Sequence, residues 1–275
     1  MYKIVASDLD GTLLDSTGNI SDENIKAIVE LAKNGVFFVP ASGRTYVEIP
    51  EKIKNIEEIR YIIYSNGAVV FDRKTGEKVS FCIPNKTACD MYNLFNEFEI
   101  HITFRHDGKS YIDRNFFGEE YFEYYNLIPE HIAVITDFAE KKDNFYDFLK
   151  SLDNIEVFAL FFHDYEEKNR CKERLEKFSD LRTVEISRYN LEVCHKDAGK
   201  GNALSALCNM VGTEVKNTIS MGDSGNDITM TKTAGLGLAM SNACDELKEV
   251  ADKVICSNDE HAVRYVVENL KGMFD

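Results

Sequence analysis

The chain has 275 residues, with 32 Lys and Arg against 47 Asp and Glu, so its formal net charge is −15. A chain of this length forms two domains or one large one. Its hydrophobic content of 44% is sufficient for a packed core and argues against disorder. The negative charge argues against binding DNA or RNA, and against docking on an anionic membrane surface.

No secretory signal or membrane span is evident in the sequence. The first residues, MYKIVASDLDGTLL, lack a basic segment followed by an apolar stretch and a small-residue cleavage site. No apolar run approaches the roughly 18 residues that a membrane span needs. The seven cysteines form no Cys-x-x-Cys pair, which favours reduced, buried thiols. We therefore expect a cytoplasmic protein.

The opening part of the chain alternates apolar runs with an amphipathic helix. Residues 2–7 predict a buried strand that ends at a pair of carboxylates. A helix capped by Ser21 follows, and Gly35 ends it. Residues 36–39 and 61–64 predict two further strands. This strand–helix–strand order predicts right-handed crossovers and a parallel sheet.

The composition changes near Pro84, beyond which Phe and Tyr become frequent. Short strands interleave with amphipathic helices as far as about Ser187, which is an α+β pattern. The strands are expected over residues 101–104, 109–112, 157–162 and 183–186. The helices are expected near residues 88–98, 144–152 and 166–178. We therefore expect an inserted α+β domain over residues 83–189.

The α/β alternation returns after residue 191, which places residues 1–82 and 190–275 in one domain. Residues 201–211 predict a helix and residues 218–221 a strand, and a final helix is expected over about 260–270. The sequence therefore predicts an α/β fold, with a Rossmann-like parallel-sheet core and an inserted α+β cap domain.

Two acidic segments follow predicted strands, at the sheet edge where open parallel sheets bind ligands. Asp8 and Asp10 are two residues apart, so in an extended backbone their side chains point the same way. The second segment, Gly222-Asp223-Ser224-Gly225-Asn226-Asp227, follows residues 218–221. Carboxylates held together repel unless they share a cation or a proton. Each segment alone is equally typical of a turn with a capping Asp, but together they suit Mg²⁺.

Lys200 and the Ser42-Gly43 pair are candidates for binding an anion. Lys200 is expected at the start of a helix, where the helix dipole disfavours a cation, so its position indicates another use. Ser42-Gly43 offers a hydroxyl and backbone N–H groups. The alternatives are a solvated surface Lys and a plain turn.

Four segments, in this order, resemble the four motifs of the haloacid dehalogenase (HAD) superfamily: DLDGTLL, ASGR, the Lys200-Gly201 segment and GDSGNDITM. The insertion between the second and third segments is similar to the Cof-like, subclass IIB branch of sugar-phosphate phosphatases. Residues 235–263 also resemble that branch. One departure is visible, because His261-Ala262 stands where the branch usually has Asp-Gly.

The resemblance implies a role for each matched residue. Asp8 would be the nucleophile that forms an aspartyl-phosphate, and Asp10 would be the general acid and base. Asp8, the backbone carbonyl of Asp10 and Asp223 would bind Mg²⁺, and Asp227 would support the metal or Lys200. The phosphoryl oxygens would be held by the backbone of Leu9 and by Ser42, Gly43, Lys200 and Asn226.

The resemblance thus implies a Mg²⁺-dependent phosphatase acting on a small phosphorylated metabolite such as a sugar phosphate. Arg44 and Asn66 lie near the same predicted edge and are candidates for contact with this substrate. The second Asp favours oxygen leaving groups over carbon–halogen cleavage. A phosphomutase and a non-catalytic protein that binds a phosphate ligand are the alternatives, and the oligomeric state is left open. The cap is expected to close over the site, with hinges near residues 81–84 and 188–191.

Overall fold

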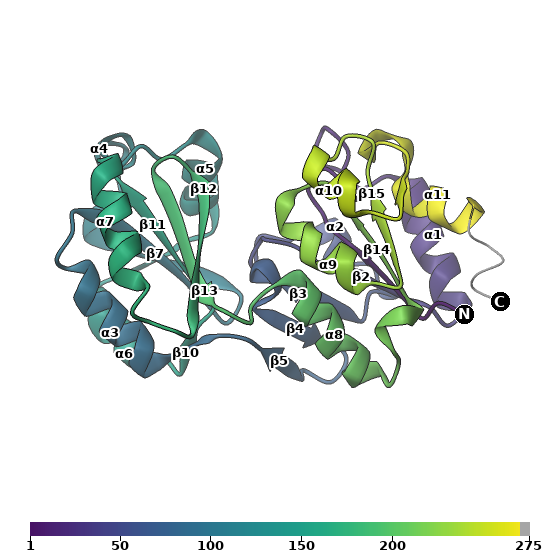
Figure 1. The fold of residues 1–275 in the computed structure, drawn as a ribbon, viewed down its shortest axis with the longest axis horizontal. Helices are drawn as coiled ribbons and strands as arrows, with labels where there is room; N and C mark the ends of the chain where they lie inside the picture. The colour runs from purple at the N-terminus through teal and green to yellow at the C-terminus, as the bar shows by residue number, and fades with distance from the viewer. Residues whose placement is uncertain (270–275) are drawn as a thin grey trace. The chain divides into compact units, whose positions relative to one another are not determined.

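The fold is seen in a computed structural model that describes residues 1–269, and these residues divide into two compact units (Figure 1). One unit, here termed the core, contains Met1–Arg44, Ile49–Ser80 and the chain from Ala198 onward. The other, termed the inserted domain, contains Thr45–Glu48 and Phe81–Asp197. The insertion expected from the sequence covered residues 83–189 alone.

The core is built on a five-stranded sheet with the order β16-β15-β14-β1-β2. Strand β1 (Ile4–Ser7) pairs with β2 (Phe37–Pro40) on one side and with β14 (Thr218–Gly222) on the other. Strands β15 (Leu236–Ala239) and β16 (Lys253–Val254) continue the sheet beyond β14. Every pairing is parallel, which confirms the expected Rossmann-like core. The carboxyl ends of β1 and β14 therefore lie side by side.

Helices pack on this sheet through their apolar faces. Ser21 caps the first helix as expected, because its Oγ accepts a hydrogen bond from the Asn24 N–H at 3.2 Å. Helix α8 buries Ala203, Leu204 and Leu207 against apolar residues of β1 and β2. The helices of the core are α1 (Asp22–Lys33), α2 (Glu51–Lys54), α8 (Lys200–Val211), α9 (Ile228–Thr233), α10 (Asp245–Val250) and α11 (Ala262–Asn269).

Strand β3 (Tyr61–Tyr64) forms a parallel bridge between its Ile63 and Ala41, the residue directly after β2, and the Ser42 N–H donates to the Ile63 carbonyl at 2.9 Å. The expected parallel contact is therefore present at this point, although β3 lies outside the five-stranded ladder. It pairs antiparallel with β4 (Val69–Asp72), which pairs in turn with β5 (Lys78–Ser80) in a separate three-stranded sheet. The tight turn at Ser65–Gly67 reverses the chain after β3 and so makes β4 antiparallel to it. The connection from β2 to β3 is instead long and contains α2, as a parallel arrangement of these two strands requires.

The inserted domain contains a six-stranded sheet with the order β12-β13-β11-β7-β8-β9, antiparallel except between β8 and β9. Its strands are β7 (Ile100–His106), β8 (Lys109–Asp113), β9 (Glu140–Lys142), β11 (Val157–Phe162), β12 (Leu181–Ser187) and β13 (Asn190–His195). A small ladder joins β6 (Ile83–Pro84) to β10 (Asn154–Ile155). The helices are α3 (Asn85–Phe95), α4 (Glu119–Tyr124), α5 (Pro129–Phe138), α6 (Phe145–Lys150) and α7 (Tyr165–Leu175).

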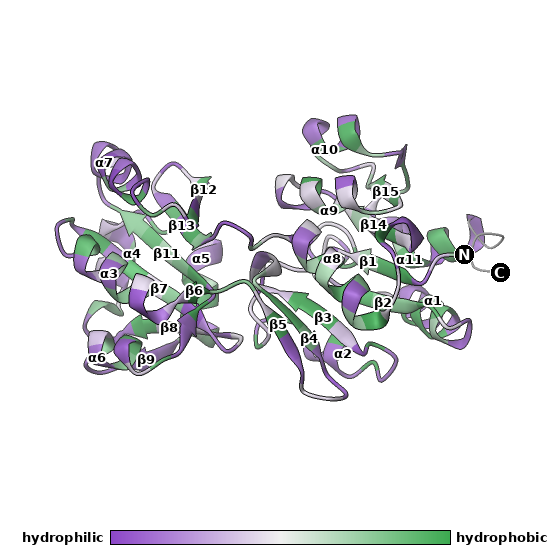
Figure 2. Cartoon of the chain, turned by 60° about the horizontal axis from the view of Figure 1, so that its bottom comes forward, coloured by the Kyte–Doolittle hydropathy of each residue, from purple (hydrophilic) through white to green (hydrophobic). Residues whose placement is uncertain are grey.

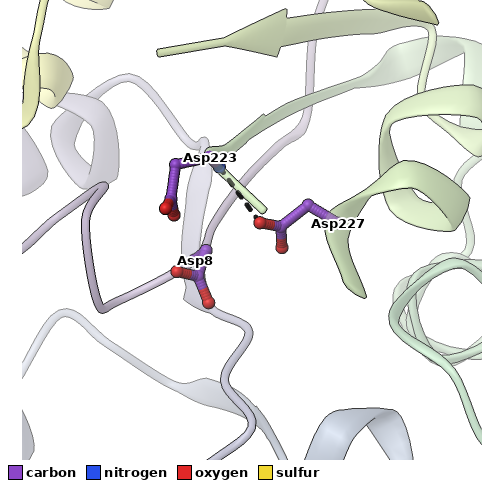
Figure 3. Close-up of side chains that lie close together, drawn as sticks. All are labelled: Asp8, Asp223 and Asp227. Carbon is purple, nitrogen blue, oxygen red and sulfur yellow. Dashed lines mark hydrogen bonds between the residues drawn. The ribbon is translucent and has the colours of Figure 1, made fainter. Parts of the chain in front are cut away.

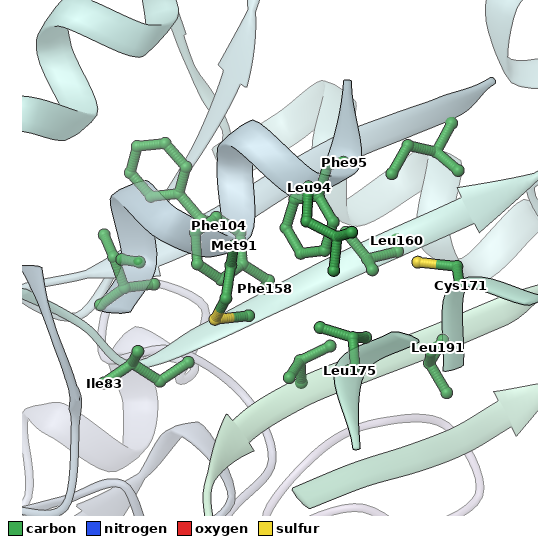
Figure 4. Packing of buried hydrophobic residues seen from close by; sticks show 14 of the residues in the cluster. Ile83, Met91, Leu94, Phe95, Phe104, Phe158, Leu160, Cys171, Leu175 and Leu191 are labelled. Atoms are coloured by element: carbon green, nitrogen blue, oxygen red, sulfur yellow. The ribbon is translucent and has the colours of Figure 1, made fainter. Parts of the chain in front are cut away.

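Apolar clusters occupy both faces of this sheet. On one face, Phe158 of the sheet packs against Phe95 of α3, and both lie in the cluster drawn in Figure 4. Phe104 of the sheet packs against Phe145 of α6 in the same cluster. On the other face, Ile112 and its neighbours pack against residues of α4 and α5. The strands of both domains are coloured mainly as hydrophobic in Figure 2, as expected for sheets covered by helices.

The expected hinge at residues 188–191 and the expected final helix differ from the structure in their position or extent. Residues 188–191 lie at the turn between β12 and β13, so they belong to the inserted sheet and are not at its junction with the core. The expected hinge there is wrong, because β13 still pairs with β11. The final helix is confirmed as α11, although Leu270 lies outside the described residues. At its start, His261 adopts a left-handed conformation with φ 60°.

Among residues 1–269, no helix combines the length and apolar character needed to cross a membrane.

We predict that Phe104→Ala destabilises the inserted domain by about 3–5 kcal/mol, because it removes a fully buried ring from an aromatic cluster. Phe116→Ala is the matched control, since that ring is 40% exposed, and we expect a loss of less than about 1 kcal/mol. Urea unfolding followed by circular dichroism measures both. Equal losses would contradict the packing described here.

Candidate active site

Three carboxylates meet where the two central strands of the core sheet end. Asp8 directly follows β1 and Asp223 directly follows β14, so the parallel pairing of these strands brings the two residues together. Asp227 lies in the turn that comes next. Each of the three offers one oxygen, and these oxygens lie within 4.8 Å of one another (Figure 3).

Lys200 joins these carboxylates from the first residue of α8. Its side chain is fully buried, and its Nζ lies 2.5 Å from Asp8 Oδ1 and 2.6 Å from Asp227 Oδ1. The Asn226 Oδ1 is also near, at 3.4 Å. The helix dipole disfavours the Lys200 ammonium at this position, but its two ion pairs compensate for that cost. Because the side chain is buried, the alternative of a solvated surface Lys is excluded.

Burial and charge act in opposite directions on these groups. Burial raises the pKa of the Asp8 carboxyl well above its usual range, and the Lys200 ammonium opposes this rise. Burial also disfavours the charge on Lys200, but Asp8 and Asp227 outweigh it, so the pKa of Lys200 lies above its usual value. Burial likewise raises the pKa of Asp223. A nearby cation would favour the ionised form of both raised carboxyls.

The donor set suits a hard divalent cation. When all are ionised, the three carboxylates and the one ammonium carry three negative charges against one positive, which leaves a net charge of −2. Oxygen ligands with this balance fit Mg²⁺, which binds one or two protein carboxylates and completes its shell with water and substrate phosphate. Asp8 and Asp223 are the side chains best placed to hold it, because Asp227 is already occupied by other donors.

Asp227 organises the turn rather than pointing freely at a ligand. Its Oδ2 accepts the backbone N–H groups of Asp223 and Ser224, each at 3.1 Å, while its Oδ1 accepts from Lys200. This carboxylate therefore fixes the backbone that carries Asp223 and the ammonium that contacts Asp8. The supporting role that the resemblance implied for Asp227 stays a prediction.

The loop after Asp8 contributes a residue that sequence reasoning missed. The Thr12 hydroxyl donates to Asp223 Oδ1 at 3.0 Å and so orients this carboxylate. Gly11 makes this close approach feasible, because its φ is 76° and a Cβ there would lie 2.6 Å from Asp223 Oδ2. The only sequence signal for Thr12 was its position directly after the Asp-Leu-Asp-Gly segment.

Asp10 does not share the environment of Asp8, although the spacing predicted that their side chains point the same way. Its carboxylate forms a two-point ion pair with Arg44, at 2.8 Å from Nε to Oδ2 and 2.6 Å from Nη2 to Oδ1. The Asp10 side chain is 55% exposed, against 6% for Asp8. The chain turns after Asp8 instead of continuing as a strand, and the two carboxylates have different partners and different exposure.

The remaining predicted residues gather around the same edge of the core sheet. Leu9 and Ser42 are buried, and Ser42 Oγ accepts the Arg44 N–H at 3.1 Å. Asn66 lies beside Gly43, where a Cβ would approach the Asn66 Oδ1 to 2.9 Å. The same Oδ1 accepts from Asn226 Nδ2 at 3.0 Å. Arg44 and Asn66, predicted as substrate contacts, thus both bind residues of the site.

Comparison with known proteins identifies the family. Residues 5–267 match the haloacid dehalogenase-like hydrolase family. The chain belongs to this family. Phosphatase YwpJ of Bacillus subtilis is 28% identical over 98% of this chain and 99% of its own. From the same organism, 5-amino-6-(5-phospho-D-ribitylamino)uracil phosphatase YcsE is 31% identical over 97% of this chain and 95% of its own.

A solved structure described as the HAD subclass IIB sugar phosphatase BT4131 has the same fold. It aligns with a TM-score of 0.75 over 98% of this chain and 99% of its own, at 21% identity. The resemblance drawn from the four segments is therefore confirmed. So is the expectation of a phosphoric monoester hydrolase, because relatives that match over nearly the whole of both chains are phosphatases.

We predict that Gly11→Ala weakens binding of a divalent cation, probed with Mg²⁺, at least about tenfold, because a methyl group at this position displaces the Asp223 carboxylate. Gly18→Ala is the control: its φ is also positive, at 78°, but nothing lies within 4 Å of the added atom. Both substitutions place Ala at a positive φ and so carry similar backbone strain, but only the methyl group at position 11 contacts the Asp223 carboxylate. Calorimetric titration with MgCl₂ compares them, and equal affinities would contradict this geometry.

Proposed function

We propose that this protein is a Mg²⁺-dependent phosphatase that hydrolyses a small phosphorylated metabolite, such as a sugar phosphate, through an aspartyl-phosphate. The observation that carries the proposal is the buried Asp8–Lys200–Asp227 arrangement beside Asp223. It combines a nucleophile, a fixed positive charge and a set of oxygen ligands at one edge of the sheet. These are the parts that phosphoryl transfer needs.

Asp8 is the proposed nucleophile. Lys200 holds its Oδ1 and fixes the orientation of the carboxylate, which a nucleophilic attack in line with the leaving oxygen requires. An oxygen of Asp8 forms a bond to phosphorus as the bond from phosphorus to the leaving oxygen breaks. The Lys200 ammonium then lies close to the negative charge of the transferred group and stabilises it.

The proposed acid and base is Asp10. Its exposed carboxyl gives a proton to the departing alcohol, and the resulting carboxylate takes a proton from the water that hydrolyses the aspartyl-phosphate. When bound, Mg²⁺ supplies positive charge for the phosphoryl oxygens and lowers the repulsion between them and Asp8. Ser42, Gly43, Asn226 and the backbone of Leu9 are the proposed further contacts of the phosphoryl group.

The printed names of the relatives support the substrate class. YcsE is a phosphatase of a phosphoribityl compound, and BT4131 is a sugar phosphatase. Both names describe phosphate esters of a polyhydroxylated carbon chain, whose leaving group is an alkyl alcohol. We extend this substrate class to the present chain. Because such metabolites are cytoplasmic, we also propose a cytoplasmic location. The inserted domain is the proposed cap of the active site.

We predict that Asp8→Asn lowers kcat for phosphate release by at least about a thousandfold, because an amide cannot form the covalent intermediate. Asp22→Asn is the matched control, since Asp22 lies on the core with a side chain 76% exposed, and its rate should equal that of the wild type. Phosphate release from a metabolite panel measures both. Equal rates for Asp8→Asn and the wild type would refute the assignment, and an isomerised sugar phosphate without free phosphate would indicate a mutase.

We predict that treatment with EDTA followed by dialysis removes the activity, and that added MgCl₂ restores it along a saturation curve. The physical reason is the net charge of −2 on the ionised cluster, which repels a phosphate dianion unless a cation is bound. Thermal unfolding with and without MgCl₂ gives a reading that is independent of turnover. Full activity in the metal-free protein would contradict the prediction.

A further inference from the structure

The contact between Arg44 and Asp10 assigns a role to Arg44 that the sequence did not suggest. We propose that Arg44 is a positioning residue: its guanidinium orients the Asp10 carboxyl toward the leaving group, and it does not bind the transferred phosphoryl group. This inference rests on the proposed function, because it concerns the general acid of that reaction.

The geometry of the pair is the first argument. Nε and Nη2 of Arg44 bind the two different oxygens of Asp10, at 2.8 and 2.6 Å. A planar guanidinium that meets both oxygens of a carboxylate restricts its rotation as well as its position, which a single-point contact with an ammonium cannot do.

The backbone of Arg44 is itself held by two hydrogen bonds. Its backbone N–H donates to Ser42 Oγ at 3.1 Å, and its carbonyl accepts the Ser65 N–H at 2.8 Å. The residue follows β2 and is tied through Ser65 to the end of β3. The guanidinium therefore extends from a backbone that is fixed on both sides, as a residue that orients another must be.

The third argument is that Asp10 needs an orienting partner. Its side chain is 55% exposed, whereas Asp8 and Asp227 are buried and held by Lys200. Within residues 1–269, Arg44 is the one side chain for which a hydrogen bond to the Asp10 carboxylate is seen. A general acid must lie within about 3.2 Å of the leaving oxygen, and a freely rotating carboxyl would spend much of its time elsewhere.

The pair is also compatible with proton transfer. A protonated Asp10 can still accept from both N–H groups of Arg44, because its hydroxyl oxygen keeps lone pairs while it donates its proton to the leaving oxygen. As the P–O bond breaks, that proton moves to the alcohol, and the carboxylate stays held at both oxygens by Arg44. The same carboxylate then accepts a proton from the attacking water, so that protons balance over the cycle.

If Arg44 orients the general acid, the loss of activity in Arg44 variants should depend on the leaving group of the substrate. An alkyl alcohol is a poor leaving group that depends on the acid, whereas p-nitrophenolate leaves with little need for a proton. We expect Arg44→Gln to lower kcat/KM about tenfold to a hundredfold for a sugar or other alkyl phosphate. For p-nitrophenyl phosphate we expect a fall of less than about threefold, because the phosphoryl group and its contacts are unchanged.

Arg44→Lys tests the two-point geometry, because Lys keeps the positive charge but has no planar guanidinium to bind both carboxylate oxygens. We expect it to show the same selective loss for the alkyl phosphate. Arg60→Gln is the matched control, because Arg60 has the same side-chain exposure of 34% and a similar two-point pair with Asp72. This control should change stability but leave the ratio of kcat/KM for the two substrates as in the wild type.

The outcomes separate this inference from the function on which it rests. If the wild type releases phosphate but Arg44→Gln and Arg44→Lys lose equal activity on both substrates, Arg44 binds the phosphoryl group and the positioning role is overturned. Unchanged or faster turnover of the alkyl phosphate by both folded variants also overturns it. If the wild type releases no phosphate from either substrate, the proposed function fails, and the inference fails with it.

Discussion

The ion pairs that the buried Lys200 makes with Asp8 and Asp227 are the interaction on which the site depends. A buried ammonium is costly unless it is paired, and removal of either carboxylate would leave an uncompensated charge. Asp8 and Lys200 are 192 positions apart in sequence, so the pair forms only when β1 and α8 belong to one domain. The chain must therefore pass from the core into the inserted domain and back without disrupting the core sheet.

The same interaction resolves the apparent conflict between an acidic chain and an anionic substrate. The net charge of −15 describes the whole protein, whereas a phosphate ester meets a local field. That field is set by Lys200, by a cation that the carboxylates can hold, and by Arg44 beside Asp10. The total charge still disfavours a polyanion, because a long anion contacts the surface at large and not one pocket.

Much of the site could be predicted from the sequence because its residues follow strands. Apolar runs identified β1 and β14, and polar residues after parallel strands must meet at one edge of the sheet. Strand β3 shows the limit of this reasoning, because its parallel contact with the end of β2 was expected but its antiparallel pairing with β4 was not. Thr12 was missed because a single hydroxyl gives no periodic signal.

The sequence by itself indicated the class of fold through the periodicity of its apolar residues, and the family through the resemblance of four segments. It also named the candidate residues of the site, because the order of motifs is a property of the chain itself. Tertiary structure alone decided which of these residues contact one another. It paired Asp8 with Lys200 and Asp10 with Arg44, and it made Asp227 the partner of both Lys200 and the backbone of Asp223. The physical reason is that hydrogen bonds and ion pairs are formed between side chains in space, and a turn of a few residues redirects them.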